Sequence, residues 1–182
     1  VSISKDGKLK THKAMGLVSH VLDDKTMATL EGNVAIGHVR YSTCGDSNVN
    51  NAQPLEGHCK LGQLAIAHNG TLTNAKIVRE LLEETGAVFQ STIDSEVILS
   101  LTSRKASKGL EQAIVDAINM IQGAYAIVMT VEGKLVGIRD PHGIRPLCLG
   151  ELKEGEYVLS SESCGLDAVG AKFLRDIAPG EM

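Results

Sequence analysis

The chain has 182 residues, a net charge of −4, a pI near 5.9 and only 3% aromatic residues. This length fits one domain with an aliphatic core. The sequence has no basic block, which makes nucleic acid and anionic membranes poor candidate partners. No apolar run reaches transmembrane length, and the four cysteines are far apart. We therefore expect a cytoplasmic protein with reduced thiols.

The first part of the chain predicts a hairpin, a short helix and an apolar strand. Loose alternation around Asp6-Gly7 is typical of a two-residue hairpin turn. The strand is predicted over residues 34–41 and carries His38 and Arg40 at its C-terminal end. Residues 42–53 are polar and rich in Gly, Asn and Ser, which indicates a surface or active-site loop.

Residues 64–74 carry the strongest functional signal in the sequence. The aliphatic start, Leu64–Ala67, has the length and composition of a buried strand. His68, Asn69 and Gly70 then predict a tight polar turn that leads into a helix. Such a turn would aim the Asn69 amide and the Gly70 N–H at one point, as an oxyanion hole requires. The alternative is an Asn-Gly turn that only joins two elements.

The middle of the chain predicts helices and the last third predicts strands. Apolar spacing predicts helices over Ala75–Glu84, ended by Gly86, and over Leu110–Ile121. Between them, Ser91 and Asp94 have capping-box spacing at the start of another helix. Hairpin-linked strands around these helices indicate an α+β fold with two antiparallel sheets covered by helices. The late strands are predicted over Ala124–Thr130, Lys134–Asp140, Arg145–Leu149 and Tyr157–Ser161.

Four polar positions are candidates for binding a charged ligand. The guanidinium of Arg40, followed by residues 41–43, could clamp a carboxylate, or it pairs with a neighbouring acid. Asp94 could bind an ammonium group, or it is a simple helix cap. The histidines have no metal-ligand spacing, so no metal site is expected. The residues alone indicate an anion-handling site of Arg40, Asn69, Gly70 and Asp94, without an evident nucleophile.

Taken together, the motifs closely resemble the glutaminase domain of glutamine phosphoribosylpyrophosphate amidotransferases, which are N-terminal-nucleophile (Ntn) amidotransferases. Each short motif is weak, but the ordered set covers nearly the whole chain. The segments Asp-Pro-His-Gly-Ile-Arg-Pro and Leu-Arg-Asp favour this family over glucosamine-6-phosphate synthase, glutamate synthase and asparagine synthetase. The matching segments are residues 37–43, 52–54, 67–74, 94–96, 123–126, 140–147, 160–163, 174–176 and 179–181.

The resemblance implies a four-layer αββα sandwich of the Ntn-hydrolase type and a glutamine site. It implies that Arg40 binds the α-carboxylate of glutamine, that Asp94 binds its α-ammonium group, and that Thr43 lines the pocket. The side chain of Asn69 and the backbone N–H of Gly70 would form the oxyanion hole. The family's nucleophile is an N-terminal cysteine whose own α-amino group is the base.

The resemblance also implies what the ammonia is used for. In the family it passes to a phosphoribosyltransferase domain, a glycosyltransferase, which converts phosphoribosylpyrophosphate to 5-phosphoribosylamine in de novo purine biosynthesis. Family members are homo-oligomers that use Mg²⁺ with phosphoribosylpyrophosphate, and some carry a 4Fe-4S cluster. No cofactor is implied for the glutaminase domain itself.

Both ends of the sequence depart from the family pattern. The family's opening Cys-Gly strand has no counterpart before Val1, and no phosphoribosyltransferase domain follows Met182. We therefore expect residues 1–182 to form a glutaminase domain that lacks its N-terminal strand and is inactive alone. Two alternatives stay open, namely the glutaminase domain of glucosamine-6-phosphate synthase and a non-catalytic glutamine-binding domain.

Overall fold

The computed structural model describes residues 1–40 and 48–182, which contain both helices and antiparallel strands. The helices are α1 (Val18–Val21), α2 (Asp24–Met27), α3 (Ala75–Glu84), α4 (Ser95–Lys105), α5 (Leu110–Ile118) and α6 (Ser163–Ala168). The strands are β1 (Ser2–Lys5), β2 (Lys8–Thr11), β3 (Val34–Ile36), β4 (Leu55–Cys59), β5 (Gly62–Leu72), β6 (Gly123–Val131), β7 (Lys134–Arg139), β8 (Cys148–Lys153), β9 (Glu156–Ser160) and β10 (Lys172–Asp176). Short 3-10 turns lie at Val49–Asn51 and Ala106–Lys108.

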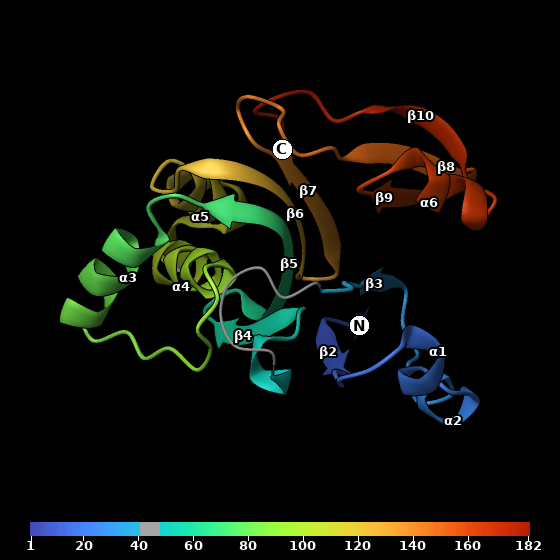
Figure 1. Ribbon diagram of the computed structural model, residues 1–182, viewed down its shortest axis with the longest axis horizontal. Coiled ribbons are helices and arrows are strands. Elements are labelled where there is room, and N and C mark those ends of the chain that lie inside the picture. Colours follow the sequence, from blue (N-terminus) through green and yellow to red (C-terminus); the bar gives the residue numbers. More distant parts are fainter. Residues whose placement is uncertain (41–47) are drawn as a thin grey trace.

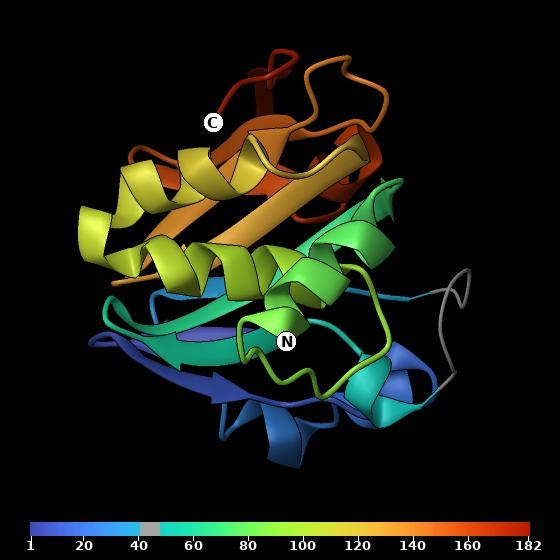
Figure 2. The same cartoon turned by 90° about the vertical axis from the view of Figure 1, so that its left-hand side faces the viewer.

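These elements form layers, as Figure 1 shows. Helices α3, α4 and α5 cover one face of a four-stranded sheet with the order β4-β5-β6-β7 (Figure 2). Two three-stranded sheets, β2-β1-β3 and β10-β8-β9, lie on its other side. Helix α6 packs against β9 and β10 (Figure 1). The predicted α+β layering of antiparallel sheets and helices is therefore confirmed.

The second sheet layer consists of two separate sheets, whereas the sequence predicted one. Strands β3 and β9 are the facing edges of these sheets, and within the described residues no strand pairs with both. A cavity of about 190 Å³ separates them; Gly37 and His38 line it on one side and Leu159 and Ser160 on the other. Asn69 of β5 also lines this cavity. The open space between the two sheets thus reaches the predicted oxyanion hole.

The main core lies between the four-stranded sheet and the helices. Its members are almost all aliphatic, as the composition predicted, and the tightly packed layer fixes β5 against α4. The described residues contain no helix long and apolar enough to span a bilayer. Fully buried core side chains on β5, β6, α4 and α5 include Leu64, Ile66, Ile127, Met129, Val97, Ile98, Leu101 and Ile114.

Local sequence signals predicted several elements correctly. The β1–β2 turn has positive φ at Asp6 (52°) and Gly7 (75°), as a two-residue hairpin turn requires. Helix α3 has the predicted bounds, and Gly86, with φ 88°, follows its end. Only some of the apolar side chains of α3 are buried: Val78 and Leu82 belong to the core, whereas Ile77 is 70% exposed and Leu81 is 49% exposed.

Other element boundaries were predicted wrongly. Strand β3 ends at Ile36, so His38 and Arg40 follow the strand and do not belong to it. Strand β8 begins at Cys148 rather than at Arg145, because the Asp140 carboxylate accepts backbone N–H groups from the preceding loop and holds it out of the sheet. Helix α5 ends three residues earlier than predicted, and neither α6 nor β10 was predicted.

Candidate active site

The predicted turn at residues 68–70 does not exist, because β5 continues through it. Asn69 pairs with Ala126 and Gly70 pairs with Tyr125 in an unbroken antiparallel register with β6. The ladder with β6 satisfies the backbone of this segment and overrides the local turn signal of the Asn-Gly pair. The candidate oxyanion-hole residues therefore lie on a rigid strand rather than in a loop.

Gly70 is required because no space remains for a side chain between β5 and β6 at this position. Its φ is +152°, and a Cβ atom there would overlap the carbonyl oxygen of Ala124. The same Cβ would lie 2.9 Å from Nε2 of His68. Only glycine therefore fits between the β6 backbone and the imidazole without displacing one of them.

The backbone of β5 directs one N–H group toward open space at this position. Strand β4 pairs with β5 only as far as Ile66, so beyond that residue one edge of β5 is uncovered. On this edge the His68 N–H donates to Gln53 Oε1 (2.7 Å) and the Leu72 N–H donates to Asp94 Oδ2 (2.8 Å). Alternate residues of a strand direct their N–H groups to the same side, so the Gly70 N–H lies between these two and faces the same edge.

A cavity of about 290 Å³ opens at this edge of β5 and contains most of the predicted site. Arg40, Asn69, Gly70 and Asp94 all line it, although they come from three segments of the chain. Thr43, the remaining predicted residue, lies outside the described residues. The lining carries charges of both signs, which suits a zwitterionic ligand such as an amino acid. Residues that the sequence reasoning missed also line the cavity, namely His38, Gln53, His68, Ser95 and Arg145.

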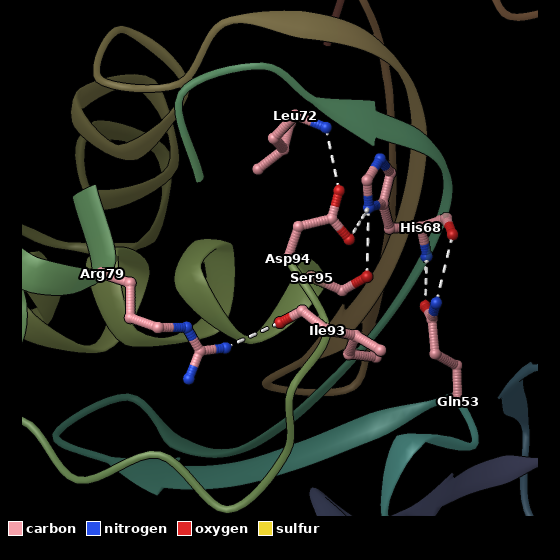
Figure 3. A network of polar contacts seen from close by, with 7 residues as sticks. All are labelled: Gln53, His68, Leu72, Arg79, Ile93, Asp94 and Ser95. Carbon is pink, nitrogen blue, oxygen red and sulfur yellow. Dashed lines mark hydrogen bonds and ion pairs between the residues drawn. The ribbon is translucent and has the colours of Figure 1, made fainter. Parts of the chain in front are cut away.

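Asp94 joins the start of α4 to β5 and does not cap its own helix. The predicted capping box is wrong, because the Asp94 side chain makes no cap hydrogen bond and Ser91 instead bonds to Glu96. The Asp94 carboxylate reaches across to β5, where Oδ2 accepts the Leu72 N–H and Oδ1 lies 3.7 Å from Nδ1 of His68 (Figure 3). Its side chain is 15% exposed, at the wall of the cavity.

The imidazole of His68 lies next to this carboxylate and is buried. Its side chain is 1% exposed, and its Nδ1 lies 3.0 Å from Oγ of Ser95 (Figure 3). Burial lowers the pKa of His68; the Asp94 carboxylate opposes this shift and the positive charge of Arg145 adds to it. The lowered pKa indicates a neutral imidazole at neutral pH.

The second imidazole of the site, that of His38, gives a pH-dependence prediction. Burial lowers its pKa from 6.5 to about 4, and the neighbouring His68 contributes to the shift. Between these two values the unfolded chain binds more protons than the folded protein, so stability is lost as the pH falls. The shift corresponds to at most about 3 kcal/mol, reduced by the partial exposure of the ring.

Urea unfolding between neutral pH and about pH 5 measures this effect. We expect the free energy of unfolding to decrease over this range in the wild type and to decrease less in His38→Asn. The Asp and Glu carboxylates change the free energy of unfolding mainly at lower pH, because their ordinary pKa values lie near 4. Equal pH slopes in the two proteins would show that His38 titrates normally.

The described residues do not form a metal or cluster site. No group of three or more His, Cys, Asp or Glu side chains among them is placed to hold a metal ion. Cys59, Cys148 and Cys164 lie in β4, β8 and α6, and none of these three lines the cavity at β5. These residues therefore do not fit an iron–sulfur cluster or supply a nucleophile to the candidate site.

The chain is similar to known glutamine amidotransferases along its length. A family model described as a glutamine amidotransferase domain matches residues 1–177. Amidophosphoribosyltransferase 2, chloroplastic, from Arabidopsis thaliana is 43% identical over 182 residues, covering 100% of this chain and 32% of that protein. The amidophosphoribosyltransferase of Rhizobium etli is 43% identical over 182 residues, covering 99% of this chain and 36% of that protein.

Solved structures agree with these sequence relatives. A structure described as that of the allosteric regulatory enzyme of purine biosynthesis matches with a TM-score of 0.92 and 38% identity, covering 98% of this chain and 38% of that one. The glutamine phosphoribosylpyrophosphate amidotransferase of B. subtilis, complexed with ADP and GMP, matches with a TM-score of 0.90 and 37% identity. This match covers 98% of this chain and 38% of that one. The chain thus spans about a third of the length of these relatives.

These likenesses confirm the predicted Ntn-hydrolase fold class and the predicted family. The relatives named here are amidophosphoribosyltransferases, and none is a glucosamine-6-phosphate synthase. The chain belongs to the glutamine amidotransferase domain family and corresponds to the glutaminase part of amidophosphoribosyltransferases.

Proposed function

We propose that residues 1–182 bind glutamine in the cavity at the edge of β5 and support hydrolysis of its side-chain amide. One observation carries the proposal. Arg40, Asp94 and the Asn69-Gly70 pair, which come from separate segments of the sequence, line the same cavity. A cation, an anion and a pair of hydrogen-bond donors match the three polar groups of glutamine, which are its α-carboxylate, its α-ammonium group and its carboxamide.

The charged groups of the cavity would hold the amino-acid end of glutamine. The forked guanidinium of Arg40 would bind the α-carboxylate, as planar Arg–carboxylate pairs do. The Asp94 carboxylate, held in place by the Leu72 N–H, would accept the α-ammonium group. We also assign Thr43 to the lining of this pocket, as the family resemblance implies.

The donors at β5 would stabilise the transition state of acyl transfer. A cysteine thiolate adds to the carboxamide carbon, and the carbonyl electron pair moves to oxygen, where the Gly70 N–H and the Asn69 amide donate to it. The C–N bond then breaks, and the nitrogen leaves as ammonia with the proton that the cysteine gave to its own α-amino group. Water hydrolyses the thioester, which releases glutamate and restores the thiol.

The nucleophile in this proposal is the N-terminal cysteine that the family resemblance implies. The space between β3 and β9 supports this assignment, because it is bounded by two strand edges and reaches Asn69. Exposed strand edges pair readily with an added extended segment. A cysteine at the end of such a segment would lie beside the Asn69 side chain.

We extend the proposal to a longer protein of the kind that the relatives represent. There the ammonia would pass to a phosphoribosyltransferase domain and give 5-phosphoribosylamine. We assign Mg²⁺, any 4Fe-4S cluster and the homo-oligomer contacts to that longer protein. We also keep a cytoplasmic location as a proposal, although the names of the Arabidopsis relatives describe those proteins as chloroplastic.

Titration calorimetry with glutamine tests the binding step directly. We expect Arg40→Ala to weaken glutamine binding by about 10- to 100-fold, because a charge-assisted hydrogen bond contributes roughly 1.5–3 kcal/mol. Arg104→Ala is the matched control, because Arg104 lies on α4 and bonds to Thr85 away from the cavity. Equal affinity of wild type and Arg40→Ala would remove Arg40 from the site and contradict the proposal.

A further inference from the structure

We propose that His68 is a positioning residue that sets the spacing between the ammonium site at Asp94 and the oxyanion hole at Asn69-Gly70. This inference rests on the proposed function and assigns a role to a side chain that the proposed chemistry does not use. The imidazole touches both parts of the site. It contacts the start of α4 through one ring nitrogen, and its other nitrogen lies against Gly70.

The Asp94 carboxylate lies against two residues of β5. Leu72 contributes a backbone donor 2.8 Å from Oδ2, and His68 contributes a ring nitrogen 3.7 Å from Oδ1. These two residues lie on either side of Gly70 along β5, and Figure 3 shows both of them next to Asp94. The Leu72 N–H thus fixes the carboxylate to β5 by a hydrogen bond, and the His68 ring packs beside its other oxygen.

The His68 ring also holds the start of α4. Nδ1 of His68 lies 3.0 Å from Oγ of Ser95, the first residue of the helix, and Ser95 is itself buried. On the other side of Asp94, Arg79 of α3 holds Ile93 by donating a hydrogen bond to its carbonyl (2.9 Å; Figure 3). Asp94 therefore lies between two anchored residues, and the imidazole is the anchor that comes from β5.

The two nitrogens of the His68 ring have different hydrogen-bonding surroundings. Nε2 of His68 is buried and has no hydrogen-bond partner among the described residues. A neutral imidazole carries one proton, and the nearby Asp94 carboxylate favours its placement on Nδ1, where Ser95 Oγ can accept it. The unprotonated Nε2 then lies in the space that a Cβ atom on Gly70 would occupy, and it makes no hydrogen bond there.

The backbone of His68 is held independently of its side chain, which makes the side chain testable. The pairing of β4 with β5 ends at Leu55 and Ile66, and Gln53 and His68 lie two residues beyond this pair in the same register. The side-chain amide of Gln53 accepts a hydrogen bond from the His68 N–H (2.7 Å) and donates one to the His68 carbonyl (3.3 Å). A substitution of the imidazole therefore leaves the strand end anchored.

Two substitutions separate the two ring nitrogens. In His68→Asn the amide nitrogen can take the place of Nδ1, whereas in His68→Gln it can take the place of Nε2. The probes are glutamine and glutaramate, which is glutamine without its α-amino group. We expect His68→Gln to weaken glutamine binding by about fivefold or more, because it loses the Nδ1 donor beside Asp94. Glutaramate binding should change by less than about twofold, and His68→Asn should bind both ligands nearly as wild type does.

A purely structural role predicts another pattern, in which both ligands weaken together and in proportion to the loss of thermal stability. That result would overturn the proposal, and so would wild-type glutamine affinity in His68→Gln. If the wild type itself does not bind glutamine, the proposed function fails. In that case ¹⁵N NMR of the His68 ring in the wild-type chain still tests the inference, because a proton on Nε2 rather than on Nδ1 would overturn it.

Discussion

Asn69→Ala is expected to lower glutamine turnover by about 100- to 1,000-fold with little change in KM, because an oxyanion-hole donor acts on charge that develops only in the transition state. Asn69 pairs with Ala126 through its backbone, so truncating the side chain leaves the strand ladder intact. The measurement is steady-state glutaminase kinetics in the proposed longer protein with an N-terminal cysteine.

A second variant separates the donor from the shape of the side chain. Asn69→Asp keeps nearly the same volume but replaces the amide donor with a carboxylate that repels the oxyanion. We expect its turnover to be at least as low as that of Asn69→Ala. An unchanged kcat in either variant, or a loss confined to KM, would remove Asn69 from the oxyanion hole.

Gly70→Ala is expected to have the largest effect on stability, because the added methyl group has no space. It would overlap the Ala124 carbonyl and press on the His68 ring, at a backbone φ of +152° that favours glycine. We expect the free energy of unfolding to fall by about 3 kcal/mol or more, as for a severe clash in a packed strand. Urea unfolding of the chain measures the loss.

Gly57→Ala is the matched control for this experiment. Gly57 lies in the adjacent strand β4, and a Cβ there would meet only the side chain of Leu99, at 3.4 Å. We expect Gly57→Ala to lower the free energy of unfolding by no more than about 1 kcal/mol, because the Leu99 side chain can shift slightly. If the two variants lose similar stability, the close approach of β5 and β6 at Gly70 is not what requires glycine.

The proposed oxyanion hole lies on a strand rather than in a loop, which fixes the direction of its backbone donor. The Gly70 N–H takes its direction from the β5 ladder, and the neighbouring donors at His68 and Leu72 are occupied by Gln53 and Asp94. A donor fixed in this way needs no reorganisation when charge develops on a bound oxygen. The Leu72 hydrogen bond also attaches Asp94, the proposed ammonium site, to this strand, so both halves of the proposed pocket share one support.

The sequence alone determined the features that depend on neighbouring residues. The hairpin turn at Asp6-Gly7 and the bounds of α3 follow from local backbone preferences and apolar spacing, so they could be predicted. The ordered motifs also identified the family and named Arg40, Asn69, Gly70 and Asp94, which line one cavity in the structure.

Only the tertiary structure decided how these residues are held. The turn signal at Asn69-Gly70 was overridden by pairing with β6, which lies more than 50 residues later in the sequence. Asp94 looked like a helix cap but bonds to Leu72, and Gln53 looked like a loop residue but completes the edge of β5. Each of these roles depends on a partner distant in the sequence, and a backbone or side chain whose hydrogen bond is made across the fold cannot be predicted from local preference.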